Sequence, residues 1–447
     1  MRAAVIAAAL ATACGARPAA RDDGLGTRHV TADDRADDHV DAGVDATAVV
    51  DAPPAPAIAR DLIAVLVPRS GPYAAIGAEL EAAIALAPAD GARRLIIDTA
   101  GDPARAAVAV DEAVAAGAVA ILGPVGAIES AAAVAAAQVR QIPIAVLAPV
   151  DGAARPQPGP PTVFHLVDSP EAEARAAARF ALALGVGSVG VLAPGDEVGL
   201  AAAEAFATAA AGLGLTVAAR GSYAVDKRTL EADVKAFLGL DPATNHRLAA
   251  HLRRSGRKGW QTFSPDVPFA LLYLPDRYDR AALVASFLPY LGVEVHSEDF
   301  PDLDALARKH GGRVPQVVQL LGSAAWNHPS LITRGGPAVE GALLLEPCPL
   351  ALGDGPAVEF VDAFRARTRR DPSPAAAAAH DAWRLVAQAR ARAAGAADPR
   401  RAFRQALAGA SLDDGACAPA TVDAAGRVER TPAVLKVDLG ALVVEPY

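Results

Sequence analysis

The stretch DLIAVLVPRSGPYAAIGAELEAAIALA at residues 61–87 decides the fold. Residues 63–67 are an unbroken apolar run, short enough for a β-strand that is buried on both faces. Pro68 ends this run, residues 70–72 form a turn, and residues 79–87 predict an apolar-rich helix. The turn therefore lies where a helix N-terminus offers backbone N–H groups to a ligand.

Strand and helix patterns alternate through the rest of the chain. Further strands are predicted at 94–98, 119–122, 144–147, 189–192, 216–219, 269–274, 317–321 and 341–345, and closing strands at 428–432 and 434–444. Helices are predicted between them, and again at 357–367, 374–394 and 399–407. This alternation predicts an α/β fold with doubly wound parallel sheets. In such sheets ligands bind beyond the carboxyl ends of the strands.

Composition bounds the class of protein. The 447 residues are enough for two α/β lobes, each with its own core. The net charge of −9 gives no electrostatic footprint for nucleic acid. A local basic run at 246–258 predicts either contact with an anionic glycan or lipid, or a solvated helix inserted between two sheet elements. Beyond the N-terminus, no apolar run reaches the roughly 18–20 residues that span a membrane.

The N-terminus predicts export. Residues 1–14 have the charged, apolar and small-residue regions of a signal peptide. Cys14 at the end of this segment resembles a bacterial lipoprotein processing site, although Ala11 stands where leucine is usual, so an ordinary secretory signal remains the alternative. Residues 15–60 carry aspartate pairs and a proline-rich run, which predict a disordered tether. In an oxidising compartment Cys348 and Cys417 either form a disulfide or remain two separate thiols.

Catalytic and cofactor motifs give no support for an enzyme. The string at 185–190 matches G-x-G-x-x-G, but a helix precedes it and a strand follows, which inverts the dinucleotide-binding context. Asp98 and Asp102 lie close together near a strand end, where helix capping by Asp102 explains the second acid more simply than acid–base chemistry. We therefore expect no catalytic residue, no metal and no cofactor.

The expected ligand-binding residues lie on the loops after the strands. They are Ser70, Gly71, Tyr73, Ala127, Ile128, Glu129, Asp151, Asp196, Asp276 and Trp326. Tyr73 and Trp326 either stack on a ligand or pack against the surface between the lobes.

Several segments together resemble one family. They are IAVLVPRSGPYAAIG at 63–77, DTAGDP at 98–103, AILGP at 120–124, IP at 142–143, PGDEVGL at 194–200, GG at 335–336, VEG at 339–341 and FRARTRRDPS at 364–373. From residue 62 to the end, the chain resembles leucine-binding-protein-like periplasmic solute-binding proteins. The resemblance implies the type I periplasmic-binding fold, in which two doubly wound lobes are joined by a three-segment hinge and close around a ligand. We expect the first lobe at 61–160 and about 348–415, and the second at 161–347 and about 416–447.

The resemblance also implies where an amino acid ligand would bind. Family members that bind amino acids hold the carboxylate with hydroxyls and amides after the third strand, where this chain has Ala127 and Ile128. The next such loop has Ala148 to Gly152 in place of the usual serine and threonine, and the acid that meets the ammonium group would fall near Ala324. Since a buried charge without partners is costly, these losses argue against a zwitterionic amino acid.

Two functions follow from these resemblances. The first is an exported, lipid-anchored solute-binding protein of an ABC-type importer, with a small polar ligand, an ABC permease as partner and membrane contact through the lipid alone. The alternative is a periplasmic lipoprotein similar to penicillin-binding protein activators, which regulate peptidoglycan synthases by contact. Activators from enteric bacteria carry an additional helical-repeat domain, for which residues 15–60 are too short and too polar.

Overall fold

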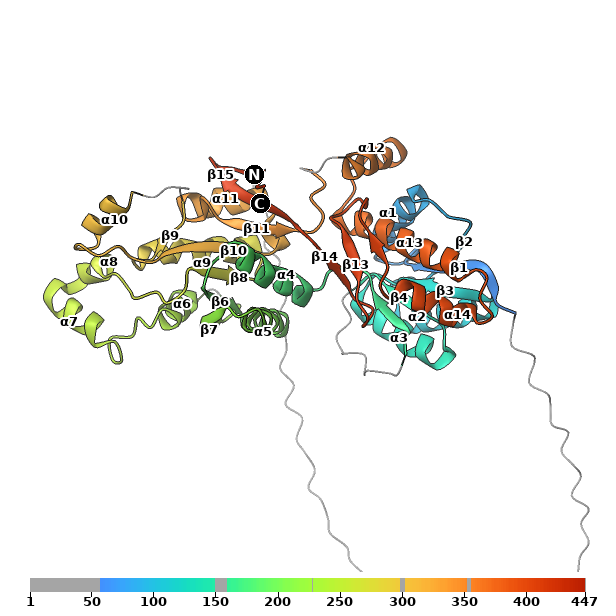
Figure 1. Ribbon diagram of the computed structural model, residues 1–447, viewed down its shortest axis with the longest axis horizontal. Coiled ribbons are helices and arrows are strands. Elements are labelled where there is room, and N and C mark those ends of the chain that lie inside the picture. Colours follow the sequence, from blue (N-terminus) through green and yellow to red (C-terminus); the bar gives the residue numbers. More distant parts are fainter. Residues whose placement is uncertain (1–56, 149–158, 227, 298–301, 352–354, 447) are drawn as a thin grey trace, which may run out of the picture. The chain divides into compact units, whose positions relative to one another are not determined.

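The computed structural model describes residues 57–148, 159–226, 228–297, 302–351 and 355–446. The signal peptide with Cys14, nearly all of the expected tether, and Asp151 lie outside these ranges. The described part of the chain forms two α/β lobes, each built around its own sheet, as the sequence predicts (Figure 1).

The first sheet has five parallel strands in the order β2-β1-β3-β4-β5. They are β1 (Ala59–Val67), β2 (Arg93–Asp98), β3 (Ala118–Leu122), β4 (Ile144–Val146) and β5 (Val163–His165). β1 is central, because β2 adds to one of its edges and β3 to the other. This strand begins at Ala59, so two residues that were expected in the tether pair within the sheet region.

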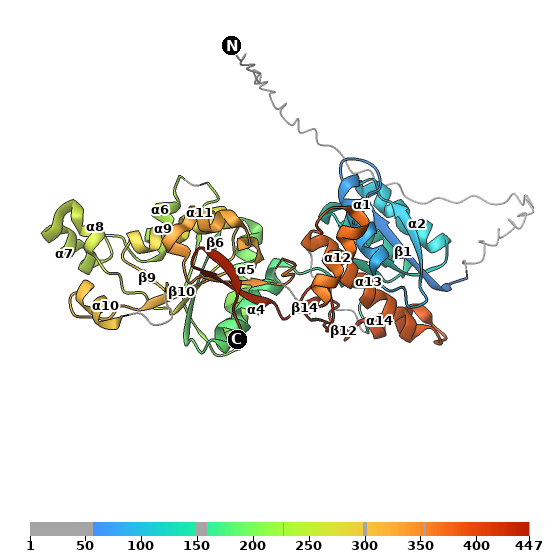
Figure 2. The ribbon, with the colours of Figure 1, turned by 90° about the horizontal axis from the view of Figure 1, so that it is seen from above.

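Both faces of β1 are covered by helices (Figures 1 and 2). Ile63, Val65 and Val67 pack with α1 (Ala74–Leu86), α13 (Pro374–Ala393) and α14 (Pro399–Leu407). Leu62, Ala64 and Leu66 alternate to the other face and pack with α2 (Pro103–Ala115) and α3 (Ala127–Arg140). α12 (Pro356–Thr368) adds an outer layer on α1. The unbroken apolar run is thus the signature of a strand buried on both sides.

Gly77 lets α1 fold back onto the end of β1. A Cβ atom at this position would lie 1.9 Å from the carbonyl oxygen of Pro68. No side chain fits at that distance, so the close approach of helix and strand requires glycine here.

The second sheet is mixed, in the order β16-β15-β11-β10-β8-β6-β7. Its parallel strands are β6 (Ser188–Pro194), β7 (Thr216–Tyr223), β8 (Leu271–Leu274), β10 (Val317–Gly322) and β11 (Leu343–Glu346), and β9 (Glu294–Val295) pairs with β10. The hairpin of β15 (Ala433–Asp438) and β16 (Ala441–Val444) joins β11 in antiparallel pairing. The sequence predicts single strands at 428–432 and 434–444. The structure instead places residues 428–430 in a different, smaller sheet and divides residues 433–444 into the two strands of this hairpin.

Helices cover both faces of the second sheet as well. α4 (Pro170–Ala183) and α5 (Glu197–Gly212) pack on one face. α6 (Leu230–Phe237), α9 (Tyr278–Tyr290) and α11 (Pro329–Gly335) pack on the other. α8 (Gly259–Thr262) and α10 (Leu303–Lys309) are short additions to this lobe.

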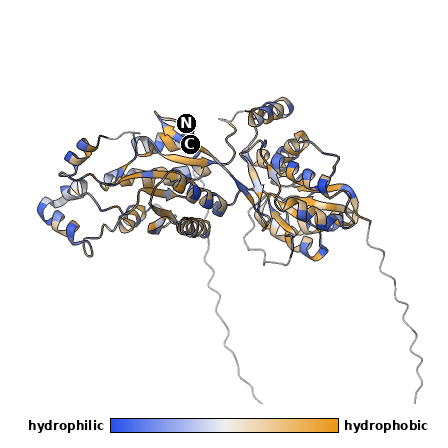
Figure 3. Cartoon of the chain, in the orientation of Figure 1, coloured by the Kyte–Doolittle hydropathy of each residue, from blue (hydrophilic) through white to orange (hydrophobic). Residues whose placement is uncertain are grey.

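The expected basic insertion is α7 (His246–Ser255), which exposes Arg253 and Arg254. This helix is largely blue in Figure 3, whereas the strands of both sheets are largely orange. Within the described ranges, no helix combines the length and apolarity that crossing a bilayer requires.

The sheets to which the strands belong place two lobe boundaries differently from those that the sequence predicts. β5 pairs with β4, so the first lobe continues beyond residue 160 to at least His165. The small sheet of β12 (Ser411–Leu412), β13 (Ala420–Val422) and β14 (Val428–Arg430) shares the core of the first lobe through Leu412 and Val422. The last crossing therefore falls between β14 and β15 rather than near residue 415. These strands are two or three residues long, too short to show a periodic pattern.

Candidate functional site

A pocket of about 240 Å³ lies at the carboxyl edge of the second sheet. It is formed by the loops after β6, β8 and β10 together with the first turns of α4 and α5. Its polar lining residues are Glu173, Asp196, Tyr273, Asp276, Arg277, Arg280 and Ser323. The pocket thus occupies the edge at which doubly wound sheets bind ligands.

Three residues donate hydrogen bonds to the carboxylate of Asp276. Tyr223 Oη donates a hydrogen bond of 2.5 Å to Asp276 Oδ2, and Arg280 Nε donates one of 2.6 Å to the same oxygen. Arg280 Nη2 and the backbone N–H of Arg277 donate to Oδ1. The hydrogen bond with Asp276 raises the pKa of Arg280, while burial and the Asp276 charge raise the pKa of Tyr223. Asp276 therefore shapes the pocket wall, and its charge is already neutralised by Arg280.

Asp196 also has a structural role in the pocket. It is the N-cap of α5, and its Oδ1 accepts a hydrogen bond of 2.8 Å from Gly199 N. This bond satisfies one of the free N–H groups of the first helical turn.

Glu173 lies in the first turn of α4 and lacks such partners. Its one side-chain hydrogen bond among the described residues comes from Ala324 N, at the long distance of 3.4 Å. Burial, and then the negative charges of Asp168 and Glu346, raise the pKa of Glu173 to about 8. A carboxyl group in this setting holds its proton near neutral pH, and a cation beside it would favour the ionised form.

Tyr273 extends the polar wall from the end region of β8. Its side chain is fully buried, its ring stacks on Phe206 of α5 at 4.7 Å between centroids, and its Oη has no hydrogen-bond partner in the described residues. A buried hydroxyl without a partner is unusual, because native structures pair nearly all such groups.

Trp326 is not a ligand-stacking residue. It is completely buried, and its Nε1 donates a hydrogen bond of 3.2 Å to the carbonyl of Leu274. After β10 the chain enters the short helical turn η2 (Ala324–Trp326), which places the indole against Gly322 in the core. Trp326 therefore packs in the core of the second lobe, which differs from both expectations, ligand stacking and packing against the surface between the lobes.

The loop after β1 is organised by Asp98. This carboxylate accepts hydrogen bonds from Ser70 Oγ at 2.6 Å, Arg69 N at 2.7 Å and Ala100 N at 2.8 Å. The Ser70 hydrogen bond is the largest cause that lowers the pKa of Asp98 to about 2. Ser70 is thus already engaged, and Gly71 is required because a Cβ there would lie 2.4 Å from the Ala100 carbonyl oxygen.

Two neighbouring groups complete this loop. Tyr73 is half exposed, and its ring lies so close to Gly101 that a Cβ there would be 2.6 Å from it. Asp102 is the N-cap of α2, because its Oδ1 accepts a hydrogen bond of 2.8 Å from Arg105 N. The capping interpretation of Asp102 is confirmed.

The loop after β3 offers no hydroxyl at its exposed positions. Ala127 and Ile128 begin α3 and are exposed, Ile128 by 78%. Glu129 is buried, and its Oε1 accepts a hydrogen bond of 2.9 Å from Gly126 N. Glu129 Oε2 and Ser130 Oγ are buried without hydrogen-bond partners in the described part of the chain.

A family model for periplasmic binding proteins matches residues 62–240 and 298–441, which is most of the chain. The chain belongs to the periplasmic binding protein family. Residues 241–297, which contain the basic helix α7, lie outside the matched segments. None of the curated proteins compared matches the chain.

Solved structures show the same fold. A putative branched-chain amino acid ABC transporter protein from Rhodospirillum rubrum is 24% identical, with a TM-score of 0.61, over 87% of this chain and 100% of that one. The C-domain of LpoA from Haemophilus influenzae, described as a regulator of PBP1A, is 18% identical with a TM-score of 0.57, over 86% and 100%. Full-length LpoA from the same organism is 17% identical with a TM-score of 0.59, over 88% of this chain and 60% of that one. At these identities the likeness shows the fold.

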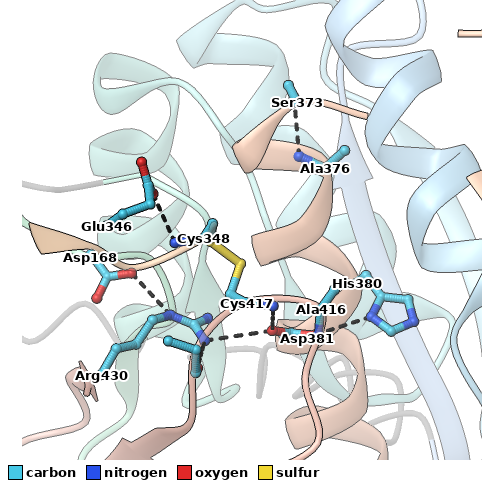
Figure 4. The surroundings of a disulfide bond; sticks show 11 residues. Asp168, Glu346, Cys348, Ser373, Ala376, His380, Asp381, Ala416, Cys417 and Arg430 are labelled. Atoms are coloured by element: carbon cyan, nitrogen blue, oxygen red, sulfur yellow. Dashed lines mark hydrogen bonds and ion pairs between the residues drawn. A yellow bond between two sulfur atoms is a disulfide. The ribbon is translucent and has the colours of Figure 1, made fainter. Parts of the chain in front are cut away.

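This periplasmic binding protein has a disulfide between Cys348 and Cys417 (Figure 4). Cys348 follows β11 of the second lobe, and its N–H donates to Glu346 Oε1 at 2.9 Å. Cys417 precedes β13, and its N–H donates to Asp381 Oδ2 at 2.9 Å. Of the two alternatives for these cysteines, the structure has the bonded one.

Arg430 links two buried acids beside this disulfide (Figure 4). Its Nε donates a hydrogen bond of 3.0 Å to Asp168 Oδ2, and its Nη1 lies 3.5 Å from Asp381 Oδ2. Burial raises the pKa of Asp168 despite this cation. The local arrangement ties the segment before α4 to α13 and β14.

The expected site residues of this periplasmic binding protein fall into two groups. Asp196 and Asp276 line the pocket, whereas Ser70, Gly71, Tyr73 and residues 127–129 belong to loops of the first sheet. Glu173, Tyr273 and Ser323 were missed. Glu173 carries no sequence signal, because acids in the first turn of a helix are common for dipole reasons. No cluster of three or more potential metal ligands occurs in the ranges that the structure describes.

Proposed function

We propose that this chain is the exported, lipid-anchored solute-binding protein of an ABC-type importer and binds a small polar ligand by hinge closure. Family membership and the pocket at the sheet edge support this function. The observation that carries it is the buried Tyr273 Oη without a hydrogen-bond partner in the described residues, together with Glu173 and its one long hydrogen bond, on the wall of a pocket large enough for a small organic molecule. Such groups cost stability unless a bound partner satisfies them.

The residues expected from the sequence keep a place in this proposal. Asp196 and Asp276 would form the rim of the pocket on the second lobe. Ser70, Gly71, Tyr73, Ala127, Ile128, Glu129 and Asp151 would face the ligand from the first lobe in a closed state. Because the loop after β3 exposes Ala127 and Ile128 and buries the acid Glu129, the ligand would not be a zwitterionic amino acid.

Anchoring is a second part of the proposal. The family is one of periplasmic proteins, which agrees with the export signal of residues 1–14. Lipid attachment at Cys14 would hold the lobes at a membrane through residues 15–60, within reach of an ABC permease. The disulfide between Cys348 and Cys417 is in keeping with an oxidising compartment.

A regulator of peptidoglycan synthesis is the second candidate. It is favoured by the likeness to the LpoA C-domain, which the chain covers completely, and by the exposed Ala127 and Ile128 where a solute would need polar partners. In that case the protein would act by contact with a peptidoglycan synthase.

A thermal-shift screen of the exported chain separates the two functions. The screen covers amines, amides, sugars, amino acids and short peptides, and solute binding predicts a saturable rise in melting temperature with one class. Ala325→Trp, at an exposed position on the pocket wall, should abolish that rise, whereas Ala243→Trp in an exposed turn should keep it. No rise with any class, together with retention of a peptidoglycan synthase in a pull-down, would establish the regulator instead.

A further inference from the structure

We propose that the ligand of the second-lobe pocket carries a positively charged N–H group and no carboxylate, with Glu173 as its counter-ion and Tyr273 Oη as a second polar partner. The inference rests on the proposed function, because it names the ligand class of the same pocket. Three observations carry it. They are the charges around Glu173, the missing hydrogen-bond partner of Tyr273 Oη, and the pairing of Asp276 with Arg280.

Glu173 forms no ion pair among the described residues. Two further acids, Asp168 and Glu346, add to its negative surroundings. One cation, Arg430, lines a small cavity with Glu173, but it is hydrogen-bonded to Asp168 and close to Asp381, and only its Nη2 is buried without a hydrogen-bond partner. The acids of this region therefore outnumber its cation. A carboxyl group without a counter-ion in a buried pocket favours a ligand that brings the opposite charge.

The cations of the pocket are already used or lie at its mouth. Arg280 makes a two-point contact with Asp276, which occupies its donors on that side. Arg277 is largely exposed and forms an ion pair with Asp279 at 3.4 Å. The two cations that line this pocket therefore have no donor that is both buried and without a partner to offer a ligand carboxylate.

Tyr273 supplies a second, independent polar group. Its Oη is fully buried on the wall of the same pocket and without a partner in the described residues, and the charge of Glu173 adds to burial in raising the pKa of this phenol. Both groups line the same pocket. A ligand with several N–H donors would satisfy the carboxylate and the phenol oxygen together.

A bound water would not replace such a ligand. Glu173 also lines a cavity of about 10 Å³, at the lower limit of the space that one water needs. A water there would hydrogen-bond Glu173 but would leave its charge uncompensated.

The alternative occupant is a neutral molecule that accepts a hydrogen bond from protonated Glu173. The two ligand types differ in pH dependence. A cation needs ionised Glu173, so its affinity should rise by up to about tenfold per pH unit between pH 6 and 8 and then level off. A neutral acceptor needs the protonated acid, so its affinity should fall over the same range. The other acids and phenol that act on Glu173 are Asp168, Glu346 and Tyr273. Arg430 lines the small cavity with Glu173, and the charged residues of the pocket itself are Asp196, Asp276, Arg277 and Arg280.

Isothermal titration calorimetry of the exported chain tests the inference. The probes are ethanolamine, putrescine and agmatine as hydrochlorides, against acetamide, ethylene glycol, acetate and glycine. We expect saturable binding of at least one amine, at least tenfold weaker in Glu173→Gln and several-fold weaker in Tyr273→Phe. Glu171→Gln, in the same helical turn but outside the pocket, should bind as the wild type does.

Each other outcome overturns a specific claim. Binding of acetamide, glycol, acetate or glycine with full affinity in Glu173→Gln, without amine binding, overturns the cationic ligand and leaves the solute-binding function standing. An amine whose affinity falls as the pH rises from 6 to 8 overturns the role of Glu173 as counter-ion. No binding of any probe, combined with a silent thermal-shift screen, overturns both the inference and the proposed function.

Discussion

Glu173 couples the stability of the second lobe to pH. Its pKa rises from an ordinary 4.5 to about 8 because burial disfavours the charged form, with Asp168 and Glu346 adding repulsion. The folded chain therefore keeps a proton that the unfolded chain loses above pH 4.5. The stabilisation is complete below pH 4.5 and is lost as the pH rises through 8.

Glu173→Gln should remove this dependence. The amide keeps an acceptor for Ala324 N and carries no charge, so the variant should be more stable than the wild type at pH 8.5 by about 1–3 kcal/mol, with a smaller difference at pH 5. Urea unfolding at both pH values measures this. Equal stabilisation at the two pH values would show that Glu173 does not titrate in this range.

Asp381 differs from Glu173 because both of its buried carboxylate oxygens accept hydrogen bonds. It accepts hydrogen bonds of 2.7 Å from Ala416 N and 2.9 Å from Cys417 N, and Arg430 lies beside it. Asp381→Ala would leave two buried N–H groups and part of a guanidinium without a partner. We expect a loss of about 3–5 kcal/mol in the free energy of unfolding.

The control for Asp381 is Asp362→Ala, which removes a largely exposed acid at 3.8 Å from Arg365. Surface pairs of this kind contribute about 0–1 kcal/mol, so its unfolding curve should be almost unchanged. A loss of similar size in both variants would contradict a special role for the Asp381 network.

At the residue scale, the sequence predicts which residues lie on loops better than it predicts their hydrogen-bond partners. It placed Ser70, Asp196 and Asp276 correctly at strand ends, but pattern alone does not reveal that Asp98, Gly199 N and Arg280 already engage them. The burial of Trp326 was not predicted, because it depends on contacts with Leu274 and Gly322. Leu274 is distant in the sequence, and Gly322 has no side chain that would contribute to a pattern. Glu173 was missed because its importance comes from missing neighbours, which a sequence does not show.

At the scale of elements, the β1–α1 unit depends on the contact at Gly77. Glycine inside a helix normally costs about 0.5–1 kcal/mol relative to alanine. Gly77→Ala should nevertheless destabilise the protein by about 3 kcal/mol, because the new Cβ would lie 1.9 Å from a backbone oxygen that cannot move aside cheaply. Thermal and urea unfolding measure the change.

Gly212→Ala is the matched control at the end of α5. A Cβ there meets nothing within 4 Å, so this variant should be unchanged or more stable by up to about 1 kcal/mol. Destabilisation at both positions would point to a general cost of replacing helical glycines rather than to the contact of α1 with β1.

Strands that are buried on both faces were predictable from the sequence. β1, β3 and β8 have core residues on both faces, which forces continuous apolar runs into the sequence. β5 and β12 to β14 have two or three residues each and are held by pairing with neighbouring strands. Tertiary contacts decide such elements, so the lobe boundaries that depend on them were placed incorrectly.

For the whole molecule, the disulfide between Cys348 and Cys417 closes a loop with a sequence separation of 69. Cross-linking over such a loop reduces the entropy of the unfolded chain by about 4 kcal/mol in the chain-entropy description. The double variant Cys348→Ala, Cys417→Ala should lose a comparable free energy of unfolding. Wild type unfolded under a strong reductant should match the variant, and an oxidised wild type no more stable than the variant would contradict the bond.

The same bond gives the chain the topology of a ring with two tails. The residues between Cys348 and Cys417 include α12, α13 and α14, of which α13 and α14 cover one face of the first sheet, and this segment begins and ends at one covalent point. A protease that cuts once in the turn at Arg369 or Arg370 would leave a single molecule of unchanged mass on a non-reducing gel. Reduction would release two fragments, and only then could β1 separate from α13 and α14.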